Sequence, residues 1–175
     1  YDSVYEQFFE AIRFKPLNIL EVGVFKGESL SAWHEYFPNA QIFGIDIFER
    51  VSEKNIEVLN RDRVHHLKLD STSSGVEAAI KRKWGSEIKF DIIIDDGLHT
   101  PLANSLTFSN LINLLSSDGI YFIEDVFPLD IMSESDLAHP WLLQNRQDYK
   151  MEDMSRFLES IKNYDVQRFD LRRFS

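Results

Sequence analysis

The side chains best suited to chemistry in this sequence are four carboxylates and a histidine that follow two apolar runs. They are Asp95, Asp96, His99, Glu124 and Asp125. The runs, residues 90–94 and 120–123, are typical of buried parallel strands, and ligands bind outside the carboxyl ends of such strands. Clustered carboxylates repel one another unless they are protonated or neutralised by a cation. If the two strands are neighbours, the pattern predicts a divalent metal with a general base beside it.

A structural interpretation of the same residues stays open. Acids at strand ends also cap the helices that follow them, and a single histidine is often a surface residue. Successive side chains of a strand alternate between its two faces, so Asp95 and Asp96 are not expected to point the same way.

The positions of these side chains depend on the strands and helices around them, which alternate along the sequence. Strands are expected at residues 17–22, 41–45, 64–69, 90–94, 120–123 and 166–171. Helices are expected at residues 3–14, 29–36, 52–60, 75–84, 103–115 and 151–163. This alternation predicts an α/β fold with a doubly wound, mostly parallel Rossmann-like sheet, and the length favours one domain over residues 1–175. Residues 126–150 form a long connection, which we interpret as a lid over the site or as a surface excursion.

The bulk composition excludes several classes of function. The 175 residues carry a net charge of −10, which disfavours nucleic acid and anionic membrane surfaces as partners. The absence of cysteine excludes a thiolate nucleophile and sulfur-ligated metals. No apolar run reaches the length of a membrane span and no secretory signal is visible, so we expect a cytoplasmic protein. Because the chain begins at Tyr1, an upstream segment is a further expectation.

A glycine-containing turn after the first expected strand predicts a cofactor loop. Its residues are Glu21, Gly23, Phe25 and Gly27. Dinucleotide-binding loops use Gly-x-Gly-x-x-Gly, whereas Phe25 stands here at the middle glycine position. The Glu21 carboxylate would repel a pyrophosphate but attract the amino group or sulfonium of S-adenosylmethionine. The turn therefore favours S-adenosylmethionine over NAD, and an NAD-dependent oxidoreductase remains the alternative.

Two further acids end the second and third expected strands. Asp46 is positioned to accept both ribose hydroxyls of a nucleoside cofactor, and Asp70 is placed near the adenine end. Asp46 could instead cap its strand, and Asp70 could be a helix N-cap or a turn residue.

Residues 21–47, EVGVFKGESLSAWHEYFPNAQIFGIDI, resemble motifs I and II of class I S-adenosylmethionine-dependent methyltransferases. Together with Asp-Asp-Gly-x-His and Glu-Asp downstream, the variant most resembles the macrolide sugar O-methyltransferases that act on macrocin and mycinamicin precursors. The resemblance extends from about Tyr1 to Asp125 and fades beyond.

This resemblance implies methyl transfer from S-adenosylmethionine to a hydroxyl of a sugar or another small polyhydroxylated acceptor. It implies that Asp96, Glu124 and Asp125 hold Mg²⁺ or a similar divalent cation and that His99 is the base. It leaves Asp95 to orient His99 or to contact the cofactor. A homo-oligomer is a further expectation.

The end of the sequence departs from the family pattern. Class I methyltransferases usually finish with an antiparallel seventh strand, and only four residues follow residue 171, so we expect a truncated chain or a degenerate last strand. A non-catalytic domain that keeps the nucleoside pocket is therefore a second alternative.

Overall fold

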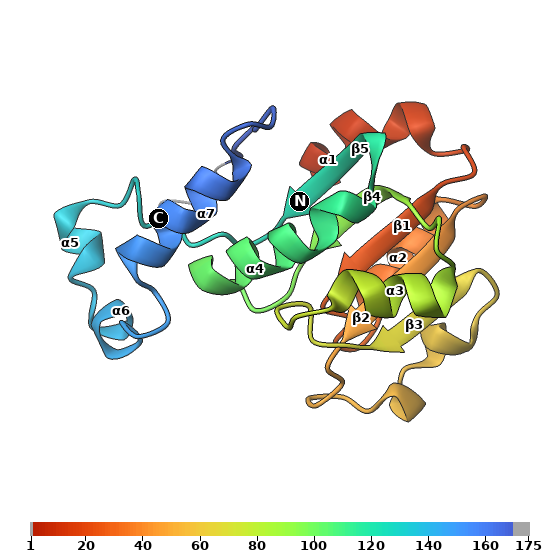
Figure 1. The fold of residues 1–175 in the computed structure, drawn as a ribbon, viewed down its shortest axis with the longest axis horizontal. Coiled ribbons are helices and arrows are strands. Elements are labelled where there is room, and N and C mark those ends of the chain that lie inside the picture. The colour runs from red at the N-terminus through yellow and green to blue at the C-terminus, as the bar shows by residue number, and fades with distance from the viewer. Residues whose placement is uncertain (1, 170–175) are drawn as a thin grey trace.

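Five parallel strands form the centre of the structure, a computed structural model that describes residues 2–169 (Figure 1). The strands are β1 (Asn18–Val22), β2 (Gln41–Asp46), β3 (Val64–Lys68), β4 (Phe90–Asp95) and β5 (Leu115–Ile123). Their order is β3-β2-β1-β4-β5, and every strand pairing within residues 2–169 is parallel. The chain progresses outward from β1 in one direction and then returns to add β4 and β5 on the other side. This reversal places a crevice outside the carboxyl ends of β1 and β4, which is where open α/β sheets bind ligands.

Helices cover both faces of the sheet, as expected for buried parallel strands. The α-helices are α1 (Asp2–Phe9), α2 (Glu28–Tyr36), α3 (Val76–Trp84), α4 (Pro101–Leu111), α5 (Glu134–Leu137), α6 (Pro140–Gln144) and α7 (Met151–Ile161). Short 3₁₀ helices occupy η1 (Glu10–Ile12), η2 (Glu53–Asn55), η3 (Glu57–Asn60) and η4 (Ile112–Leu114). One face packs through Ile19 and Ile92 against Phe9 of α1 and Leu30 of α2. The opposite face packs against α3 and α4.

The helix expected at residues 52–60 is wrong, because two 3₁₀ turns occupy this segment. Ile56 between them has an extended backbone (φ −110°, ψ 97°) and a buried side chain. The extended residue allows methyl groups of Ile56 and Val58 to pack closely over Gly27, where an added Cβ would lie 2.7 and 2.5 Å from them. Tertiary packing against the cofactor loop therefore prevents a continuous α-helix here.

Strand β5 begins earlier than the sequence indicated. Its register with β4 jumps from Phe90↔Leu115 to Ile92↔Ile120, so an irregularity within the strand precedes the expected residues 120–123. Such an irregularity removes residues from the ladder without ending the pairing.

The C-terminal helices form a separate small layer beyond the carboxyl ends of the strands (Figure 1). Its core contains Leu129, Leu142, Met154 and Phe157, and α7 packs against α4. Residues 126–150 are thus a segment with short helices that shares an apolar cluster with α7. Residues 166–169 carry no strand, and residues 170 and 171 of the expected last strand lie outside the described residues.

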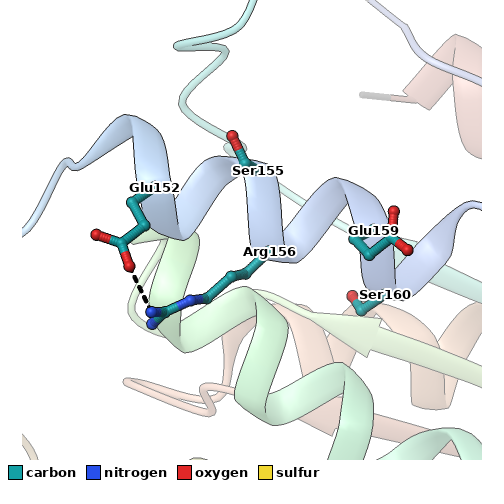
Figure 2. Close-up of a pocket in the computed structure, with 5 residues that line it drawn as sticks. All are labelled: Glu152, Ser155, Arg156, Glu159 and Ser160. Carbon is teal, nitrogen blue, oxygen red and sulfur yellow. Dashed lines mark hydrogen bonds and ion pairs between the residues drawn. The ribbon is translucent and has the colours of Figure 1, made fainter.

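A shallow pocket on α7 is unrelated to the ends of the strands. Figure 2 shows its five lining residues on this one helix, with Arg156 paired to Glu152 at 2.5 Å. Five side chains of one exposed helical face cannot enclose a ligand. Among residues 2–169, no helix is both long and apolar enough to cross a membrane.

Candidate active site

Backbone hydrogen bonds extend the sheet by one residue at the carboxyl ends of β4 and β5. The Asp96 N–H donates to the Val22 carbonyl at 3.0 Å, and the Glu124 N–H donates to the Asp95 carbonyl at 2.9 Å. Asp96 and Glu124 are therefore held side by side on adjacent strands. By strand alternation both share the sheet face that carries Glu21, the face covered by α1 and α2.

Three side chains meet at this edge. Ligand atoms of Asp96, His99 and Asp125 all lie within 4.8 Å of one another. His99 Nε2 is 3.6 Å from Asp96 Oδ1, and the two side chains are 32% and 38% exposed. The convergence expected from the two strand ends is thus present for these three residues.

His99 and Asp125 have unusual backbone conformations. Their φ angles are 58° and 46°, in the left-handed region that only a few per cent of non-glycine residues adopt, Asn, Asp and His more often than others. Such conformations cost about 1–3 kcal/mol each and cluster at functional sites. The fold therefore stabilises a strained backbone at two of the three converging residues.

Glu124, the fourth expected member, lies beside this cluster rather than within it. Its Oε1 accepts a hydrogen bond from the hydroxyl of Tyr5 in α1. Burial raises the pKa of the Glu124 carboxyl, and the charges of Asp96 and Asp125 raise it further. The second oxygen, Oε2, is thus the oxygen that Glu124 can offer to an ion.

The charges and donors at this edge fit a divalent cation. Burial and the neighbouring Asp125 raise the pKa of Asp96, while His99 opposes the shift. A bound cation would relieve this repulsion, and carboxylate oxygens are the ligands that Mg²⁺ prefers. His99 Nδ1 is buried without a hydrogen-bond partner among the described residues.

Asp95 points to the opposite face of the sheet, as strand alternation predicts. It is 1% exposed and accepts hydrogen bonds from the Asn104 side chain and the Gly97 N–H. Burial raises its pKa to about 7 despite these donors. Its Oδ2 has no hydrogen-bond partner in the described part of the chain, so the structure shows no contact by which Asp95 orients His99.

The loop between β1 and α2 lies at the same edge, next to β2. Gly23 and Gly27 have φ angles of 92° and 79°, and Phe25 between them has 47°. Asp46 fixes the loop: its Oδ2 accepts the Phe25 N–H at 3.0 Å and its Oδ1 accepts the Phe48 N–H at 2.6 Å. A carboxylate has about four acceptor positions, so Asp46 keeps capacity for hydroxyl donors. This arrangement fits a nucleoside cofactor at the end of β2.

Gly23 is required by close contact between the loop and the end of β4. An added Cβ would lie 2.1 Å from the Asp96 carbonyl oxygen, whereas nothing lies within 4 Å of one at Gly75, which has a similar φ of 81°. We expect Gly75→Ala to cost about 1–2 kcal/mol for backbone strain alone, and Gly23→Ala to cost about 1–3 kcal/mol more from overpacking. Urea unfolding of both variants measures the difference. Equal losses would contradict a steric role for Gly23.

Glu21 is buried at the end of β1 and is bonded to α2. It is 1% exposed. Ser29 Oγ donates to Oε1 at 2.5 Å, and Trp33 Nε1 donates to Oε2 at 2.6 Å. Burial raises its pKa to about 8, although both donors oppose the shift. Glu21 therefore anchors the first turn of α2 beneath the cofactor loop.

The raised pKa of Glu21 predicts a pH dependence of stability in metal-free, cofactor-free protein. Between about pH 4.5 and 8 the folded state keeps a proton that the unfolded state has lost, so the free energy of unfolding falls as pH rises. We expect Glu21→Gln to flatten this fall by up to about 1.4 kcal/mol per pH unit. Gln can accept from Trp33 while donating to Ser29 Oγ, so the variant keeps its partners.

Denaturant titrations of both proteins in EDTA at pH 5, 6, 7 and 8 measure this effect. The difference between the two proteins isolates Glu21 from Asp95, Asp96 and Glu124, whose pKa values are raised in both. Parallel pH profiles would show that Glu21 titrates normally.

Asp70 forms a local turn after β3. Its Oδ1 accepts hydrogen bonds from the N–H of Thr72 at 2.9 Å and from its hydroxyl at 2.7 Å, and the residue is exposed. These contacts agree with the interpretation of Asp70 as a turn residue. A contact between Asp70 and adenine stays a prediction.

Four residues of the site were not identified from the sequence. They are Tyr5, Ser29, Trp33 and Asn104. For Trp33 the residue type alone partly predicts its hydrogen bond, because a buried indole N–H requires an acceptor. The hydrogen bonds of the Tyr5 and Ser29 hydroxyls and of the Asn104 amide could not be predicted, since their partners are fixed only by the packing of helices on the sheet.

Several known proteins are similar to this chain in sequence or in fold. No protein-family model matches the chain. Over 134 residues it is 31% identical to the 8-demethyl-8-(2-methoxy-alpha-L-rhamnosyl)-tetracenomycin-C 3'-O-methyltransferase of Streptomyces olivaceus, covering 73% of this chain and 32% of the relative. Over 132 residues it is 32% identical to the mycinamicin VI 2''-O-methyltransferase of Micromonospora griseorubida, covering 70% of this chain and 30% of the relative. The chain thus spans about a third of the length of the curated relatives it matches.

Among solved structures, the MycE methyltransferase from the mycinamycin biosynthetic pathway, in complex with Mg and SAH, has the same fold. The TM-score is 0.63 at 24% identity, covering 93% of this chain and 43% of that chain. The sheet order and its flanking helices define the Rossmann-like fold of class I methyltransferases. The homologues of this chain are the macrolide and tetracenomycin sugar O-methyltransferases.

Proposed function

We propose that this chain is an S-adenosylmethionine-dependent O-methyltransferase that acts on a hydroxyl of a sugar or another small polyhydroxylated acceptor. The observation that carries the proposal is the convergence of Asp96, His99 and Asp125 within 4.8 Å beside a glycine-containing nucleoside loop. The named activities of the relatives, together with the Mg and SAH bound to the MycE methyltransferase, support the choice of chemistry.

Three carboxylates are proposed to hold the divalent cation. Asp96 and Asp125 offer oxygens from the ends of β4 and β5, and Glu124 adds Oε2. When bound, Mg²⁺ supplies positive charge that lowers the pKa of a nearby hydroxyl. The protein's own contribution is a set of negative side chains fixed by backbone hydrogen bonds at the strand ends.

The cofactor is proposed to lie across the ends of β1 and β2. When bound, S-adenosylmethionine supplies a methyl group on a positively charged sulfur. Gly23 and Gly27 shape the loop, and Asp46 offers acceptors to ribose hydroxyls. Asp70, in the turn after β3, is proposed to face the adenine. Glu21 contributes by holding α2 in place through Ser29 and Trp33.

His99 is proposed to be the base. Its Nε2 accepts the proton of the acceptor hydroxyl, and Asp96 Oδ1 at 3.6 Å stabilises the imidazolium that forms. Asp95, buried behind them, contributes to the shape of the β4 end through Asn104 and Gly97.

Two measurements test the proposed function. Methyl transfer to a panel of sugars and glycosides is expected to stop in EDTA and to return with MgCl₂. Calorimetry is expected to show binding of S-adenosylmethionine and not of NADH. Tighter binding of NADH would support an oxidoreductase instead. Binding of S-adenosylmethionine without turnover across the panel would support a non-catalytic nucleoside-binding domain.

A further inference from the structure

Tyr5 links the N-terminal helix to the end of β5. Its hydroxyl donates to Oε1 of Glu124, a residue 119 positions away in the sequence. The function proposed above requires only the strand ends and their loops. It gives no reason for α1 to carry a polar group at this position, so the contact needs its own explanation.

Aromatic packing fixes where the Tyr5 hydroxyl can lie. The ring stacks on Phe9 with a centroid distance of 5.1 Å, and meets Trp33 and Phe122 edge-on at 5.1 and 4.9 Å. Phe9 is itself buried against Trp33, Phe37 and Phe122. Because the ring is held on three sides, the hydroxyl is a pre-positioned donor rather than a mobile one.

The contact with Tyr5 also gives the two carboxylate oxygens of Glu124 different roles. Oε1 accepts the hydrogen bond from Tyr5, and the charges of Asp96 and Asp125 act on the same carboxylate, so Oε2 is the oxygen that can face an ion. A carboxylate ligand whose other oxygen is hydrogen-bonded is held in one orientation, and such outer partners typically tune metal affinity.

We propose that Tyr5 is a positioning residue for the ion site: its hydroxyl fixes Oε1 of Glu124 so that Oε2 faces a divalent cation shared with Asp96 and Asp125. This inference rests on the proposed function and assigns α1 a role in it.

The test is calorimetric titration of the chain with MgCl₂. We expect Tyr5→Phe to weaken Mg²⁺ binding by about 10-fold or more, within the 10–100-fold range for lost outer-sphere contacts. Phe keeps the aromatic packing, so the affinity for S-adenosylmethionine is expected to stay unchanged, which a merely structural role would not predict. Tyr36→Phe, which removes a hydroxyl from α2, is the matched control and is expected to bind Mg²⁺ like the wild type.

Unchanged Mg²⁺ binding by Tyr5→Phe would overturn the proposal. Tighter binding would overturn it as well, because Tyr5 would then compete with the ion for Glu124. In a Glu124→Gln background, Tyr5→Phe is expected to have little further effect, since the coupling passes through that carboxylate. An equal loss in both backgrounds would also overturn it. If the wild type binds no Mg²⁺, the ion site itself fails, whereas equal affinities of wild type and Tyr5→Phe remove only the role of Tyr5.

A second measurement needs no change at Tyr5, should Phe there prevent folding. In a chain labelled at the tyrosine ring carbons, we expect one tyrosine NMR signal to move during titration with MgCl₂, with the calorimetric midpoint. The movement is expected to disappear in Glu124→Gln. A titration in which no tyrosine signal moves, or in which the movement survives Glu124→Gln, would contradict the proposal.

Discussion

Asp96→Asn is expected to lower methyl transfer by about 10²–10³-fold, the loss seen when one pre-organised electrostatic group is removed from an active site. Asp96 lies 3.6 Å from His99 and within 4.8 Å of the ligand atoms of both His99 and Asp125. The substitution therefore removes one proposed ligand charge and the partner of the imidazolium. Burial and Asp125 already disfavour its charge, so metal-free stability is expected to stay equal or rise.

Asp118→Asn is the matched control. It makes the same change at an exposed acid in the irregular start of β5, at the opposite end of that strand. Turnover, Mg²⁺ affinity by calorimetry and thermal unfolding of both variants complete the test. Wild-type turnover by Asp96→Asn would remove Asp96 from the ion site, and a similar loss in Asp118→Asn would show that net charge is responsible.

The edge of the sheet was predictable because strand ends leave a local signal. Apolar residues stop at Asp95 and Glu124, and alternation alone separates Asp95 from Asp96. The structure places Asp95 at 1% exposure on one face and Asp96 with His99 on the other. Such assignments require no knowledge of distant contacts.

The role of α1 could not be predicted, because helical periodicity does not distinguish one aromatic residue from the next. Tyr5, Phe8 and Phe9 all pack against Phe122, and only the position of α1 on the sheet decides which ring carries a hydroxyl to Glu124. The same limit applies to Glu21. Its carboxylate was expected to face the cofactor, and the sequence did not reveal that Ser29 and Trp33 each donate to one of its oxygens.

The segment 52–60 shows a further limit of local pattern. Its apolar residues suit a helix, but Ile56 takes an extended conformation so that it and Val58 can pack over Gly27. Here contact with a residue about thirty positions earlier overrides helix propensity, which is worth only a few tenths of a kcal/mol per residue for ordinary residues.

His99→Asn is the substitution that separates a base from a metal ligand. His99 lies as close to Asp96 and Asp125 as a ligand would, so proximity does not assign its role. Asn suits this position because it tolerates the left-handed backbone that His99 adopts, with φ of 58°. As a base, His99 supplies proton transfer, so its loss is expected to lower kcat by about 10²–10⁴-fold. The affinities for Mg²⁺ and S-adenosylmethionine are expected to remain, because the oxygen ligands that Mg²⁺ prefers are all kept.

The matched control for His99→Asn is His139→Asn, at an exposed histidine that caps α6 by accepting the Trp141 N–H at 3.2 Å. Asn is an equally good N-cap, so this variant is expected to keep wild-type turnover and stability. Single-turnover kinetics and MgCl₂ calorimetry together separate the outcomes. A steep fall in turnover with unchanged Mg²⁺ affinity assigns His99 to proton transfer. A parallel loss of Mg²⁺ affinity would make the imidazole a ligand.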